Sequence, residues 1–163
     1  MGMDVQEAIR RSINTEKNAM YFYRKCAQHI RDTGARRVFE LLEREEREHA
    51  GLFYRYYRHE DIPSLDAYLD SPPDNGSVCI ATLEKLVRDD FCEKRALELA
   101  MEKELELQQS LLKTALAIEE PAVRSVFEQN AQETYNHYLL IEAEYVRMMR
   151  MVDESDMDTY VRE

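Results

Sequence analysis

Residues 42–53 read LEREEREHAGLF and contain a single histidine, His49, placed three residues after Glu46. Side chains three residues apart lie on one face of an α-helix, so this carboxylate and this imidazole point the same way. Two interpretations are open: a solvated helix with an incidental histidine, or one half of a metal site that faces into a helix bundle. The choice depends on whether the rest of the chain supplies the other half.

The composition favours one domain of long amphipathic helices. The 163 residues are 34% charged and 44% hydrophobic, with only four glycines and four prolines, a mixture that is too apolar for disorder and offers few turns. The net charge of −11 argues against a nucleic-acid partner, which requires a basic surface. The three cysteines form no C-x-x-C pair, so a disulfide framework and a cysteine-ligated metal are both disfavoured, and a reducing cytoplasm is expected. No apolar run approaches the roughly 18 residues of a membrane span.

Four long stretches repeat apolar residues with the helical period of 3.6. They cover about residues 4–30, 35–59, 90–119 and 121–152, and Pro121 stands in the first turn of the last one, where its missing N–H costs nothing. Short turns predict two antiparallel hairpins, joined by a crossover of about residues 60–89 that has room for short helices. The expected fold is an all-α four-helix bundle over residues 1–152, followed by an acidic tail at 153–163.

The chain repeats itself at a spacing of 88 residues. Over the 50 positions from 8 to 57, 13 residues are identical to the residue 88 positions later, where roughly three matches are expected from average residue usage. The repeat pairs Glu16 with Glu104 and His49 with His137. We therefore interpret the chain as two copies of one helical hairpin.

Each copy places a glutamate midway along its first helix, and the position three before the histidine follows 30 residues later (46 − 16 = 134 − 104 = 30). In an antiparallel hairpin this spacing brings the glutamate level with the histidine. The glutamates lie on apolar stripes, where an ionised carboxylate needs a compensating positive charge. A Glu from each of two helices and a Glu-x-x-His from the other two is the ligand set of ferritin-like di-iron and di-manganese bundles. Carboxylates and imidazoles without thiolates suit iron or manganese.

Four segments carry a resemblance to a known family: AIRRSINTEKNAMYFY (8–23), LEREEREHAGLF (42–53), ALELAMEKELELQQSLL (96–112) and VFEQNAQETYNHYLL (126–140). Nearly all of the chain outside the crossover and the tail resembles the rubrerythrin branch of the ferritin-like superfamily, which implies a ferritin-like four-helix bundle. The resemblance implies a di-iron centre, with manganese or a mixed pair as variants, and no catalytic residue beyond the metal ligands. The implied ligands are Glu16, Glu46, His49, Glu104 and His137, with Glu46 as the bridge.

Three features depart from that family's pattern. Thr134 stands where the repeat and the family place a carboxylate, and the adjacent Glu133 is a weaker ligand candidate. Leu107 stands where rubrerythrins carry a further glutamate one turn after Glu104. No four-cysteine iron site follows the bundle, so electrons are expected from a separate protein such as rubredoxin.

The resemblance implies an oxidoreductase that reduces hydrogen peroxide or oxidises Fe(II), with hydrogen peroxide or dioxygen as the oxidant, in a homodimer. The alternative is a degenerate ferritin-like module with one metal or none that handles metal or contacts a partner. A storage cage is disfavoured because no fifth helix is apparent. The tyrosines near the predicted site are expected mostly to pack the bundle, with electron relay or bonding to metal ligands as the alternatives: Tyr21, Tyr23, Tyr135 and Tyr138.

Overall fold

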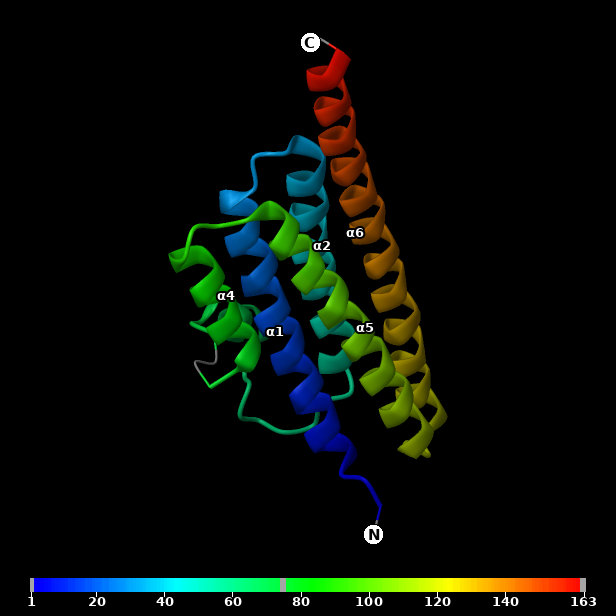
Figure 1. Cartoon of the computed structure of the whole chain (residues 1–163). Coiled ribbons are helices and arrows are strands. Elements are labelled where there is room, and N and C mark those ends of the chain that lie inside the picture. The colour runs from blue at the N-terminus through cyan, green and yellow to red at the C-terminus, as the bar shows by residue number, and fades with distance from the viewer. Residues whose placement is uncertain (1, 74–75, 162–163) are drawn as a thin grey trace.

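The computed structural model describes residues 2–73 and 76–161, with the side chains of the last helix described as far as Met151. The described residues form six α-helices and no β-strand, which confirms the predicted all-α fold. Four long helices make the bundle in Figure 1: α1 (Val5–His29), α2 (Thr33–Tyr54), α5 (Glu93–Ala117) and α6 (Pro121–Val161). The crossover between α2 and α5 carries two short helices, α3 (Leu65–Asp70) and α4 (Val78–Arg88).

The bundle consists of two hairpins. Helix α1 packs along α2, and α5 packs along α6. Between the hairpins, α2 and α6 contact each other more extensively than α1 and α5 do. Helix α4 lies against the outer side of α1 (Figure 1). The two faces of the bundle therefore differ: one is closed by α2 and α6, and the other is more open between α1 and α5.

Two helix ends differ from the sequence prediction. Helix α2 ends at Tyr54, several residues before the predicted end, because Gln6 at the start of α1 binds the next backbone groups. Its amide donates to the carbonyl of Tyr56 and accepts from the N–H of Arg58. Helix α6 continues to Val161, through most of the predicted acidic tail, and projects past the end of the bundle (Figure 1). No glycine or proline follows Pro121, so no residue of the helix-breaking kind ends α6 earlier.

The apolar core of the described residues divides into two large clusters and a small third one around Met20. One large cluster contains Phe39 and Ile30, and the other contains Phe127 and Ile118, which are the residues 88 positions later. Residues related by the repeat therefore lie in different large clusters. The pseudo-twofold axis that relates the two hairpins passes between these clusters and exchanges the two ends of the bundle. None of the described helices is long and apolar enough to cross a membrane.

Candidate metal centre

The five predicted ligands meet in the middle of the bundle. Glu16 comes from α1, Glu46 and His49 from α2, Glu104 from α5 and His137 from α6. Each of them is no more than 3% exposed. Helical periodicity explains the placement, because each residue shares its stripe with core residues, as Glu16 does with Ile13 and Met20. The sequence prediction that these side chains converge at mid-bundle agrees with the structure.

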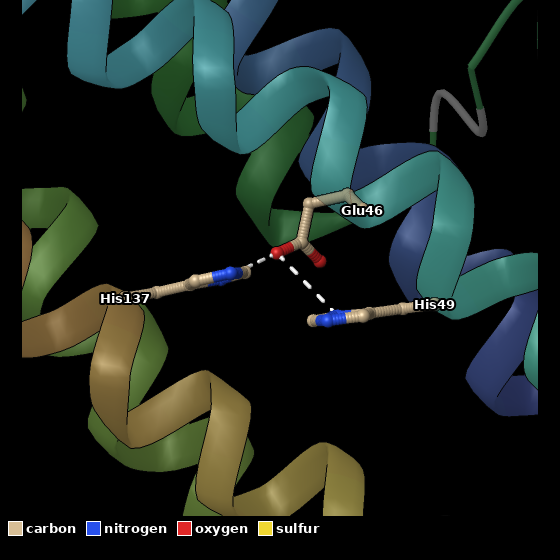
Figure 2. Close-up of side chains that lie close together, drawn as sticks. All are labelled: Glu46, His49 and His137. Carbon is tan, nitrogen blue, oxygen red and sulfur yellow. Dashed lines mark ion pairs between the residues drawn. The ribbon is translucent and has the colours of Figure 1, made fainter.

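Both imidazoles direct Nδ1 toward the same carboxylate oxygen. Oε1 of Glu46 lies 2.8 Å from Nδ1 of His137 and 3.8 Å from Nδ1 of His49 (Figure 2). The flanking glutamates lie one on each side: Oε2 of Glu16 is 4.0 Å from Nδ1 of His49, and Oε2 of Glu104 is 3.9 Å from Nδ1 of His137. The two rings stack with centroids 5.1 Å apart and planes 10° from parallel. Glu46 therefore lies at the centre of a nearly symmetric arrangement.

The outer nitrogens of the two histidines are held by reciprocal contacts between α2 and α6. Nε2 of His137 lies 2.6 Å from Oε2 of Glu45, and Nε2 of His49 lies 2.6 Å from Oε2 of Glu133. Each carboxylate accepts a hydrogen bond from the N–H at Nε2 of its histidine. In a neutral ring the lone pair is then on Nδ1, which faces the centre of the cluster. Metal-binding histidines are commonly oriented in this way. We call these two contacts the histidine braces.

Glu45 is a site residue that the sequence analysis did not single out. The signal was available, because Glu45 and Glu133 are themselves one of the identical pairs of the 88-residue repeat. The carboxylate of Glu133, the weaker ligand candidate, contacts the outer nitrogen of His49 and is 37% exposed. It thus lies on the α2–α6 side of the ring.

Tyr23 supports the opposite side of the cluster. Its buried hydroxyl donates a hydrogen bond to Oε1 of Glu104. Oε2 of the same carboxylate, on the side of His137, has no hydrogen-bond partner. The tyrosine therefore fixes one oxygen of Glu104 and leaves the other for the centre.

Each of the five predicted ligands has a buried atom without an aligned hydrogen-bond partner. These atoms are Oε2 of Glu16, both carboxyl oxygens of Glu46, Nδ1 of His49, Oε2 of Glu104 and Nδ1 of His137. Leaving one buried polar atom unpaired costs about 1–3 kcal/mol, so this concentration is hard to reconcile with a purely structural role. A bound cation satisfies such atoms together. Among the described residues, Glu46, His49 and His137 each offer one atom within 4.8 Å of the others, and the donor set fits iron or manganese.

The protonation of the metal-free cluster is strongly perturbed. Burial and the charge of Glu46 raise the pKa of Glu104 to about 8 and raise the pKa of Glu16 well above its ordinary value. Burial also opposes charge on Glu46, but its contacts with Glu16 and His137 outweigh burial and lower its pKa. For His137, burial opposes the charged form, yet the contact with Glu46 prevails and raises the pKa to about 9. In the metal-free cluster, bound protons therefore neutralise part of the negative charge that a cation would otherwise neutralise.

Thr134 breaks the symmetry of the centre. It is 1% exposed, and its hydroxyl oxygen is buried without a hydrogen-bond partner. Thr134 is the residue 88 positions after Glu46 and is therefore its equivalent in the repeat. The α6 side of the cluster thus lacks the carboxylate that Glu46 supplies on the α2 side. The centre holds three buried carboxylates and two imidazoles.

Comparison with protein families gives a match over most of the chain. The family model described as Rubrerythrin matches residues 7–145, a range that includes the five predicted ligands, Thr134 and both histidine braces. No curated protein and no solved structure matches the chain significantly. The matched range covers most of the chain, and the buried Glu/His group in a helical bundle agrees with it. The chain belongs to the rubrerythrin family.

Proposed function

We propose that this protein is a non-haem di-iron oxidoreductase that reduces hydrogen peroxide or oxidises Fe(II). The observation that carries the proposal is the set of buried oxygen and nitrogen atoms without an aligned hydrogen-bond partner on the five side chains at mid-bundle. Glu16, Glu46 and His49 would hold one metal, and Glu104 and His137 would hold the other, with Glu46 shared between them. Iron held by these residues would supply one-electron redox chemistry and a Lewis acid for the oxygen atoms of the oxidant.

The protein's own residues would keep the centre ordered and shielded. The histidine braces hold the ring protons on Nε2, so that Nδ1 of His49 and of His137 faces the cluster. Tyr23 orients Glu104. The two apolar clusters on either side limit the access of bulk water, which strengthens the interactions of the carboxylates with a cation.

The electron donor and the assembly are also proposals. We propose that a separate protein such as rubredoxin supplies the electrons. A homodimer in the cytoplasm is the expected form, and sedimentation of the purified protein checks the oligomeric state.

The test loads the protein with Fe(II) without oxygen, removes free iron and follows the consumption of hydrogen peroxide with reduced rubredoxin as donor. A parallel sample, exposed to dioxygen, reports Fe(II) oxidation. We expect activity that depends on iron and is lost in Glu46→Ala, with Glu48→Ala on the exposed face of α2 as the control. A protein that retains iron and performs neither reaction would overturn the proposed function.

Thr134 supports a second candidate, a ferritin-like module that holds one metal and has no redox turnover. The α6 side offers one carboxylate fewer than the α2 side, and the hydroxyl of Thr134 has no partner. Retention of one metal per chain without either activity would favour this candidate.

A further inference from the structure

A cleft opens onto the centre from the face between α1 and α5. Its volume is about 320 Å³, and its lining includes Tyr23 and Glu104, the hydrogen-bonded pair that borders the metal centre. On the opposite face the histidine braces tie α2 to α6. The α1–α5 cleft therefore leads to the centre on the face opposite the braces.

The cleft lies on the pseudo-twofold axis of the chain. Several of its wall residues are pairs separated by 88 positions: Asn18 with Glu106, Ala19 with Leu107, and Phe22 with Ser110. In none of these pairs are the two residues alike, so the repeat has diverged where α1 faces α5. The repeat has not diverged at the buried ligand positions of these two helices, where Glu16 and Glu104 are identical.

The cleft is too large for hydrogen peroxide alone. A volume of 320 Å³ corresponds to roughly ten water molecules at about 30 Å³ each, whereas hydrogen peroxide has two heavy atoms. Its walls include the side chains of Phe22, Ala19 and Leu107. These dimensions and walls suit a molecule with an apolar body of about ten heavy atoms.

The polar groups of the cleft favour an uncharged ligand. The ammonium of Lys103 is already placed over the ring of Phe22, 4.2 Å from its centroid, and contacts the thiol of Cys79. Glu106 is exposed at the rim. Asn18 lines the cleft, is 8% exposed, and its carbonyl oxygen has no hydrogen-bond partner, so it can accept a hydrogen bond from a hydroxyl.

From these features we propose that the α1–α5 cleft binds small organic hydroperoxides, with the apolar body against Phe22 and Leu107 and the hydroperoxyl group toward Asn18 and Glu104. The inference rests on the proposed function for its chemistry. In ROOH + 2 e⁻ + 2 H⁺ → ROH + H₂O, the O–O bond breaks and each oxygen gains one electron. Both electrons come from the separate one-electron carrier protein, and the two protons come from solvent.

The binding test uses 2-phenyl-2-propanol, the alcohol formed from cumene hydroperoxide, and needs neither metal nor turnover. An NMR titration of the metal-free full chain should give saturable binding with a Kd of about 1 mM, as expected for about ten heavy atoms at modest efficiency. Ser110→Trp fills the cleft from an exposed position and should weaken binding at least tenfold. Gln109→Trp, exposed on the same helix and outside the cleft, should bind as the parent does.

A second measurement compares substrates on the iron-loaded protein. The ratio of kcat/KM for cumene hydroperoxide to that for hydrogen peroxide should fall at least tenfold in Ser110→Trp and stay unchanged in Gln109→Trp. Absence of alcohol binding in the parent, or equal binding in both variants, would overturn the inference. If the alcohol binds in the cleft but the iron-loaded protein reduces no peroxide, the proposed function fails while the cleft stands as a binding site.

Discussion

Replacing Thr134 by glutamate tests the asymmetry of the centre. The substitution adds a fourth carboxylate beside Glu16, Glu46 and Glu104, at a position that is 1% exposed. Without metal, the new side chain would be buried in its neutral form. Protonating a glutamate of ordinary pKa at pH 7 costs about 4 kcal/mol. For a chain of this length the melting temperature should then fall by roughly 10 °C.

With metal present, Thr134→Glu should gain more stability than the parent does. Two divalent cations bring four positive charges, and the parent centre offers three carboxylates, so the position beside Glu104 and His137 should bind its metal more weakly than the other. A fourth carboxylate that raises affinity there 10- to 100-fold stabilises the loaded state by about 1–3 kcal/mol more than in the parent. The increase in melting temperature on adding Mn(II) should therefore be larger in Thr134→Glu than in the parent by roughly 5 °C.

The assay is a set of thermal melts followed by circular dichroism, with and without Mn(II), on the parent, Thr134→Glu and Thr134→Gln. The glutamine variant matches the glutamate in size and lacks its charge, so it separates the effect of a new ligand from that of altered packing. An Mn(II)-induced increase in Thr134→Glu no larger than in the parent or in Thr134→Gln would refute the reasoning that Thr134 occupies a vacated ligand position.

Two further predictions concern protons and the histidine braces. The folded pKa values of Glu104, about 8, and His137, about 9, lie above their ordinary values, so the stability from their bound protons is lost as pH rises through them. Metal-free protein should lose on the order of 4–5 kcal/mol of unfolding free energy between pH 6.5 and 9, whereas the stabilisation by Mn(II) should grow because metal competes with the proton on imidazole. Urea titrations across that pH range measure the unfolding free energy with and without Mn(II). Parallel pH profiles of the unfolding free energy with and without Mn(II) would contradict the prediction. Glu45→Ala and Glu133→Ala should each weaken Mn(II) binding 10- to 100-fold by calorimetry, and equal affinities in these variants and in Glu48→Ala would show that the braces do not orient the ligands.

Much of the fold could be predicted from the sequence because the decisive signals are local or repeated. The 3.6-residue periodicity located the four long helices, and the 88-residue repeat related the two hairpins. The end of α2 could not be predicted, because it depends on Gln6, which binds the backbone of Tyr56 and Arg58 across the fold. The length of α6 could not be predicted from the acidity of its last residues, because acidic residues do not by themselves end a helix and no glycine or proline interrupts the segment.

The candidate site was predictable to the extent that its residues share a spacing. Glu46 and His49 lie on one helix face, and the repeat supplied Glu104 and His137, so their convergence followed from the pattern. The role of Glu45 was not predictable by that rule, since it stands one position away from the inward face and its partner is on α6. The α1–α5 cleft depends on the distance between two helices, which the sequence pattern does not encode.

We propose that the five side chains at mid-bundle bind two metals with unequal affinity. Anaerobic Fe(II) titration of the metal-free protein, followed by calorimetry, tests this proposal, with metal content after desalting determined by mass spectrometry. We expect two binding steps per chain, the second at least tenfold weaker than the first, and loss of both in Glu46→Ala, because Glu46 is shared. Two steps of equal affinity would contradict the asymmetry assigned to Thr134, and the retention of no iron would contradict the metal centre itself.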